Sequence, residues 1–268
     1  MDFLRQYLFA VQSFTRLPVR GTLAQWMDAS PETMRASAAH FPGVGWLVGM
    51  AACAAFALAG LVLGDNPFAP LAAAVICIGA TLLLTGSAHE AGLARTADAF
   101  GAAVAASSPG APAADPRLGS HGVLALALAV LAKASLLAVL AAQSPTAVLA
   151  ALLAAHVLSR FWPLLLRPTL PWLGAVGAAG DGTLADRIEP RGLGIAAAWS
   201  IFAVAIAWFA EGPAFAILAL AAGGLALLWM RWLFARHLQG FTASGLGATQ
   251  QACEAATYLG AAIGLRVG

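Results

Sequence analysis

Apolar residues occur along this chain in long runs. A helix that crosses a bilayer needs roughly 17–25 predominantly apolar residues. Six runs have this length, and a seventh at 250–265 is shorter; the six are 43–64, 67–86, 121–142, 145–166, 193–211 and 213–235. Backbone polar groups in lipid must be satisfied within the chain, which predicts that these runs are helices. We therefore expect one all-α domain over 1–268, a polytopic membrane bundle of six to seven transmembrane helices.

The first 40 residues follow a different pattern. One helical face is apolar and carries Phe3, Leu4, Tyr7, Leu8, Val11 and Phe14, whereas Arg5, Gln6 and Gln12 lie opposite. Such a helix is predicted to lie in the membrane interface, or equally to pack on the protein's own surface. Ser30 followed by Pro31 predicts the start of a short second helix. Residues 1–40 are thus expected to form interfacial or cytoplasmic helices before the first span.

Composition supports a membrane protein. Of the 268 residues, 61% are hydrophobic and 10% are charged, and the mean hydropathy is +0.83. Soluble domains usually carry about 25% charged residues. This difference excludes an ordinary soluble domain.

Basic residues are distributed unevenly between the two sides of the predicted bundle. The connections "DNP", "QSP" and "EGP" contain no Lys or Arg, whereas the alternate connections carry most of the arginines. Arginine-bearing loops are usually cytoplasmic. We therefore predict a multi-pass protein of the bacterial inner membrane with cytoplasmic loops at 87–120 and 167–192. Long polar segments on one side indicate an enzyme or receptor site there, rather than a transporter with access from both sides.

Three polar segments of this predicted cytoplasmic side carry candidate chemistry. "TGSAHEAGLARTADAFG" places His89, Glu90, Arg95 and Asp98 directly after an apolar run, and "DPRLGSHG" adds Asp115, Arg117 and His121. Between them, "AAVAASSPGAPAA" is typical of a flexible loop. The third segment, "GFTASGLGATQQACE", is a Gly/Ser/Thr-rich turn that leads into a helix. Its Thr242 and glycines suit phosphate binding at a helix N-terminus, and helix packing explains them about as well.

Lys133 lies about twelve residues into its predicted span, which is ~18 Å along a helix. An ionisable side chain at that depth costs roughly 2.5–3.5 kcal/mol and indicates a functional site by default. The alternative is a neutral or carboxylate-paired lysine that holds helices together. Arg160, inside another span, raises the same two alternatives.

An ordered set of motifs runs through nearly the whole chain. It comprises "SFTRLPV", "HFPGVGWLVG", "HEAGLARTADAFG", "DPRLGSHG", "LAKASLL" and "GFTASGLGATQQACE". In this order, and on the predicted cytoplasmic side, the set resembles the cobalamin synthase family, the adenosylcobinamide-GDP ribazoletransferases. Members of that family join α-ribazole or its 5′-phosphate to adenosylcobinamide-GDP and release GMP.

The resemblance implies roles for particular residues. The catalytic set would be His89, Asp98, Asp115, Arg117 and Lys133, and the Mg²⁺ ligands would be Asp98, Asp115 and Glu90. Substrate and phosphate would be bound by Arg16, Arg95, His121, Thr242, Gly247 and Gln251. The implied partners are the two substrates and the lipid bilayer, with no nucleic acid. A second copy of the chain and other membrane-associated enzymes of cobalamin biosynthesis are further candidate partners.

The chain departs from the family pattern at several acidic positions. Ala91, Arg95 and Ser244 stand where the family motifs have aspartate, and Ala99 and Ala243 stand where they have glycine. Phosphoryl transfer depends on charge neutralisation, and Mg²⁺ prefers carboxylate and phosphate oxygens. The losses therefore favour a first alternative, a catalytically degenerate homologue that binds substrate or pathway partners. A second alternative is a transporter or structural membrane protein.

Overall fold

The computed structural model describes residues 2–27, 30–106, 119–173 and 188–268. In these ranges the chain is helical, apart from one isolated bridge between Trp172 and Phe241. The helices are α1 (Asp2–Phe14), α2 (Thr22–Trp26), α3 (Pro31–Ser37), the 3₁₀ turn η1 (Ala38–His40), α4 (Phe41–Leu63), α5 (Ala69–Thr85), α6 (Ala88–Ala106), α7 (Ser120–Gln143), α8 (Pro145–Leu166), α10 (Pro190–Glu211), α11 (Pro213–His237) and α12 (Ala243–Val267). The predicted all-α class is confirmed.

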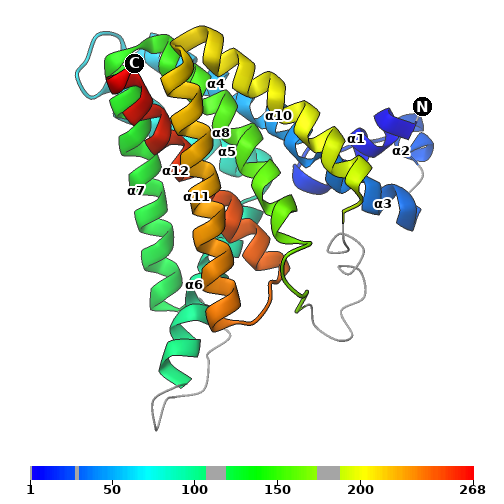
Figure 1. Cartoon of the computed structure of the whole chain (residues 1–268). Helices are drawn as coiled ribbons and strands as arrows, with labels where there is room; N and C mark the ends of the chain where they lie inside the picture. Colours follow the sequence, from blue (N-terminus) through cyan, green and yellow to red (C-terminus); the bar gives the residue numbers. More distant parts are fainter. Residues whose placement is uncertain (1, 28–29, 107–118, 174–187) are drawn as a thin grey trace.

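Five helical stretches in the described residues are long and apolar enough to cross a membrane. They are Pro31–Leu63, which joins α3, η1 and α4, and the helices α7, α8, α10 and α11. The chain is thus a multi-pass membrane protein. The tight connections between these spans gather at one end of the bundle, at the top of Figure 1.

The span predicted at 67–86 needs a correction. Helix α5 has 17 residues, and with α6 it forms a pair bent by 94°, which makes either a broken sixth span or a re-entrant segment. The bend follows from Gly86 and Ser87, whose φ angles of 72° and 59° lie in the left-handed region. Glycine adopts this region without a steric penalty and therefore ends helices readily.

The prediction of a loop over 87–120 was wrong for its first part, because residues 88–106 form α6. Polar residues suggested a loop, yet the segment is rich in alanine, the strongest helix former. Its polar side chains lie on a helix that packs against α7 and α12. Residues 107–118, with most of the predicted flexible stretch, lie outside the described part, as do residues 174–187 of the other predicted loop.

Helix α12 occupies the centre of the bundle and contacts α6, α7, α8 and α11 (Figure 1). The seventh element was predicted at 250–265. It is a longer helix of 25 residues, which begins at Ala243. Glycines allow its close approach to α11: a Cβ on Gly260 would overlap the carbonyl oxygen of Leu218, and one on Gly264 would lie 2.5 Å from the Cα of Phe215. Small residues commonly form such contacts between membrane helices.

The N-terminal helices form a layer against one side of the bundle, at the right of Figure 1. Helix α1 packs on α3 and α4, and its Tyr7 ring stacks on Trp199 with centroids 5.5 Å apart. Packing on the protein's own surface, one of the two predicted alternatives, is thus confirmed. Ser30 begins α3 as expected, because its hydroxyl accepts the backbone N–H of Thr33 at 3.3 Å.

Substitution of Gly260 tests the α11–α12 contact. We expect Gly260→Ala to destabilise the fold by about 1–3 kcal/mol, because the added methyl group must displace the Leu218 carbonyl. Gly60→Ala in α4 is the matched control, since a Cβ there meets no atom within 4 Å. Thermal unfolding of the purified variants in detergent measures the difference. Equal unfolding midpoints for the two variants would contradict the close contact.

Candidate functional site

The deepest polar contact in the described bundle joins α7 to α12. The Lys133 ammonium donates hydrogen bonds to Gln251 Oε1 at 2.7 Å and to Glu254 Oε1 at 3.0 Å. The side chains of Lys133 and Glu254 are each only 5% exposed, so their ion pair is shielded from solvent. Lys133 is thus paired with a carboxylate, and its role in the functional site stays a prediction.

This ion pair belongs to a hydrogen-bonded network that links four helices. The Gln250 amide donates to Glu254 Oε2 at 2.9 Å and to Ser159 Oγ of α8 at 3.1 Å. The Gln251 amide donates to Glu90 Oε1 of α6 at 2.9 Å. Each of these bonds either joins two helices or orients a side chain that does so. The network therefore fixes the positions of α6, α7 and α8 relative to α12.

Helix α8 adds two basic side chains beside Glu254. The Nδ1 atom of His156 lies 3.8 Å from Glu254 Oε2, and the Arg160 guanidinium donates to the His156 carbonyl at 2.7 Å. Arg160 is 1% exposed and lies 5.7 Å from the centre of the Phe41 ring. Lys133 and Arg160 together balance the formal charges of Glu90 and Glu254. Lys133 and Glu254 form a direct ion pair, whereas Arg160 and Glu90 are held by hydrogen bonds to a carbonyl and an amide. Buried charges are tolerated when they have such partners.

Unsatisfied polar atoms in and around the network include Arg160 Nε in α8 and two atoms at the first turn of α6. His89 Nε2 and Glu90 Oε2 are buried and have no hydrogen-bond partner among the described residues. The His89 ring lies 5.6 Å from the Phe41 ring, and its backbone packs against Gly247, where a Cβ would be 3.2 Å from the His89 Cα. Buried polar atoms normally have a partner, so these two atoms indicate where water or a ligand binds.

Asp98 has a structural role near the middle of α6. Its carboxylate accepts the backbone N–H of Gly119 at 2.8 Å and of Gly122 at 2.7 Å. These bonds satisfy free N–H groups at the N-terminus of α7, where a negative charge is also favourable. Asp98 therefore caps α7 from a neighbouring helix. Asp115 and Arg117, which were predicted to act beside it, lie outside the described residues.

The remaining predicted residues are dispersed. Arg95 and His121 are exposed, and His121 lies against Gly101 at the α6–α7 junction. Arg16 lies at the α5–α6 bend, where its backbone N–H donates to the Leu84 carbonyl at 2.7 Å. Thr242 caps α12 by accepting the N–H of Gly245 at 3.1 Å. The structure thus brings together His89, Glu90, Lys133, Gln251 and Gly247, and places Asp98 and His121 in a second group.

The described residues contain no group of three or more His, Cys, Asp or Glu side chains that could hold a metal ion. Glu90 and Asp98 are eight residues apart on α6, ~12 Å along its axis, and they face α12 and α7 respectively. Glu90 Oε2 has no hydrogen-bond partner in the described part of the chain and suits Mg²⁺, which often takes one or two carboxylates together with substrate phosphates. The role of Asp98 as a metal ligand stays a prediction.

Two of the substituted acidic positions lie close together. Gly92 follows Ala91, and a Cβ on Gly92 would be 2.7 Å from the carbonyl oxygen of Ser244. Residues 91 and 244 therefore flank the same crossing of α6 and α12, next to His89. The motif positions that this chain has altered belong to the region where the network ends.

Glu254, Gln250 and His156 are central to the network but were absent from the predicted site. A signal for Glu254 was available, because a deeply placed Lys133 requires a buried acid and the last helix contains Glu254. The sequence could not select this partner, because the pair is 121 residues apart. No comparable signal identifies His156.

Removal of the Glu254 charge tests the balance of the network. We expect Glu254→Gln to destabilise the protein by about 3–5 kcal/mol, because it leaves Lys133 buried without a carboxylate. The double variant Glu254→Gln with Lys133→Met should recover part of this loss. Glu211→Gln is the control, since Glu211 accepts a hydrogen bond from Thr146 at an exposed site. Thermal unfolding in detergent distinguishes the cases, and a single variant as stable as the control would refute the argument.

Comparison with known proteins supports a family assignment. The family model described as cobalamin-5-phosphate synthase matches residues 6–262. A relative from Polaromonas sp. is 46% identical, and the alignment covers 98% of each chain. Relatives from Polaromonas naphthalenivorans and Albidiferax ferrireducens are 44% and 43% identical, with at least 98% of each chain covered. All three carry the name adenosylcobinamide-GDP ribazoletransferase.

No solved structure matches the chain. The match to the family model extends from α1 to the last turns of α12 and includes every residue of the buried network. This protein belongs to the cobalamin-5-phosphate synthase family.

Proposed function

We propose that this protein is an adenosylcobinamide-GDP ribazoletransferase, which acts in the last steps of cobalamin biosynthesis. The observation that carries the proposal is the similarity, over nearly the full length, to relatives of that name. The substrates would be adenosylcobinamide-GDP and α-ribazole or its 5′-phosphate, and GMP would be released.

The reaction is a phosphoryl transfer. A ribazole hydroxyl attacks the phosphorus that carries the corrinoid, because GMP keeps the other phosphorus. The bond between that phosphorus and the bridging oxygen breaks, and the bridging oxygen leaves with GMP. The hydroxyl proton passes to a base. Such reactions depend mainly on positioning and charge stabilisation.

His89 is the residue we assign as the base. Its Nε2 atom has no partner among the described residues, and a histidine nitrogen within hydrogen-bond reach of the hydroxyl can accept the proton. The buried network acts as support: Gln251 holds one oxygen of Glu90, and Lys133 holds Gln251. Rigid support of this kind keeps reacting groups in a productive geometry.

Mg²⁺ is proposed to bind with the substrate diphosphate. Glu90 is the described side chain that would hold it, because its Oε2 atom is free, and substrate phosphates would complete the coordination. When bound, the ion would neutralise the charge on the transferring phosphoryl group.

The degenerate homologue remains a second candidate. It is favoured by Ala91, Arg95 and Ser244, which stand where the family motifs carry carboxylates. Turnover by the unaltered chain separates the two candidates, because the degenerate homologue would bind substrate without releasing GMP.

We further propose that the protein lies in the bacterial inner membrane with the α6 end of the bundle in the cytoplasm. The support is the absence of Lys and Arg from the connections at 64–68, 144 and 212. Association with a second copy or with other membrane-bound enzymes of the pathway stays a prediction.

GMP release tests the transferase proposal. Purified protein in detergent, given adenosylcobinamide-GDP, α-ribazole phosphate and Mg²⁺, should release GMP, and chelation of the metal should stop the reaction. His89→Ala should lower kcat by about 10²–10⁴-fold through loss of the base. Glu211→Gln, at the opposite end of the bundle, is the control. Absence of GMP from a folded wild-type protein would favour the degenerate homologue.

Cysteine labelling tests the orientation. In a background without Cys53, Cys77 and Cys253, a single cysteine at Asn66 or Gln143 should react with an impermeant thiol reagent applied to intact cells. A cysteine at the exposed Arg95 position should react only after the cells are opened. Labelling of position 95 in intact cells would reverse the assignment.

A further inference from the structure

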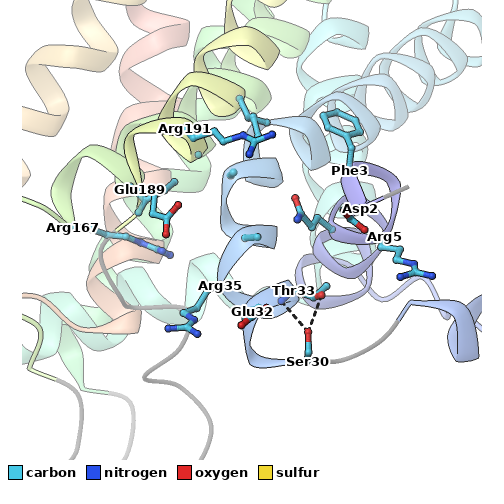
Figure 2. Close-up of a pocket in the computed structure, with 16 residues that line it drawn as sticks. Asp2, Phe3, Arg5, Ser30, Glu32, Thr33, Arg35, Arg167, Glu189 and Arg191 are labelled. Atoms are coloured by element: carbon cyan, nitrogen blue, oxygen red, sulfur yellow. Dashed lines mark hydrogen bonds between the residues drawn. The ribbon is translucent and has the colours of Figure 1, made fainter.

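One cavity of the described structure lies outside the buried network. It has a volume of about 830 Å³ and lies where α1, α3, the end of α8 and the start of α10 meet (Figure 2). Four arginines line it, and each comes from a different segment: Arg5, Arg35, Arg167 and Arg191. Ligand pockets for small molecules typically measure about 300–1,000 Å³, so the space suits a nucleotide.

The arginines of this cavity suit a phosphate-bearing ligand. A guanidinium group offers a planar fork of donors that matches phosphate oxygens in pairs. Arg35 and Arg191 are exposed to the cavity and form no ion pair with a described carboxylate. Arg5 lies 4.9 Å from the centre of the Trp26 ring, a contact that leaves guanidinium donors available.

Acidic and aromatic groups share the cavity with the arginines. Asp2, Glu32 and Glu189 also line it. Glu189 is the N-cap residue of α10, yet its side chain makes no capping hydrogen bond. A carboxylate accepts hydrogen bonds at both oxygens, and guanine presents two neighbouring N–H donors on one edge. The ring of Phe3, which is 53% exposed, offers a surface on which a base can stack.

The cavity is connected to the buried network through η1 and the start of α4. Ala39 of η1 lines it, and two residues further on Phe41 contacts the His89 ring and lies 5.7 Å from the Arg160 guanidinium. Arg167 follows Arg160 by seven residues, about two turns and ~10.5 Å along α8.

We propose that this cavity binds the GMP half of the corrinoid substrate, which is the guanosine with the phosphate bonded to it. The arginines hold this phosphate, Glu189 accepts the guanine N–H groups, and Phe3 stacks on the base. This inference rests on the proposed transferase function and assigns the half of the substrate that leaves as GMP. A phospholipid headgroup would share the phosphate chemistry, but it would leave the carboxylate and the aromatic ring without a role.

The test uses purified full-length protein in detergent and GDP as the probe. The double variant Arg35→Gln/Arg191→Gln should weaken GDP binding, measured by calorimetry, by about tenfold or more through loss of charge-assisted bonds. It should raise KM for adenosylcobinamide-GDP and leave KM for α-ribazole phosphate unchanged. Glu189→Gln should weaken binding of GDP but not of ADP. The control is Arg20→Gln, an exposed arginine outside the cavity, which should bind GDP as the wild type does.

Unchanged GDP binding in the double variant, with an unfolding midpoint like that of the control, would overturn the assignment. A lipid arm uses nanodiscs of phosphatidylcholine with and without phosphatidylglycerol. If the double variant loses only phosphatidylglycerol binding, the occupant is a headgroup and the nucleotide assignment fails. Wild-type protein that binds GDP through these arginines but releases no GMP would instead contradict the transferase proposal and leave the nucleotide site intact.

Discussion

The balance of charge around Glu254 is the constraint on which the bundle depends. Charged side chains lie here among helices that are largely apolar, and a buried charge is costly without a partner. Partners of α12 are supplied by α6, α7 and α8. The same contacts that neutralise the charges therefore set the relative positions of the helices. The fold and the candidate site thus depend on the same set of contacts.

Much of the fold follows from the apolar runs in the sequence, because length and hydropathy are properties of a single segment. The polar helices were harder to predict. Polar side chains in α6 suggested a loop, although alanine content favours a helix, and those at the start of α12 concealed that this helix begins at Ala243 rather than near residue 250. An average hydropathy cannot distinguish a polar group that faces water from one that faces another helix.

The candidate site, like the fold, could be predicted from the sequence only in part. The motifs identified the segments that carry His89, Glu90 and Gln251, and the structure brings these residues together. Pairing of Lys133 with Glu254 depends on how α7 and α12 pack, which no local pattern contains. Asp98 matched a motif position, but its geometry assigns it to the N-terminus of α7. Position in a motif thus located the region, and the packing of the helices determined which side chains are in contact there.

The bonds from Asp98 to Gly119 and Gly122 have a consequence for how this family can vary. They join Asp98 of α6 to two residues at the start of α7, which follow it by 21 and 24 residues. The two helices on either side of the connecting segment are therefore held together. Once the ends are anchored, a doubling of the intervening length costs only about 0.6 kcal/mol in closure entropy. Insertions, deletions and changes of composition between the end of α6 and the start of α7 can therefore accumulate while the helices that carry the site keep their places.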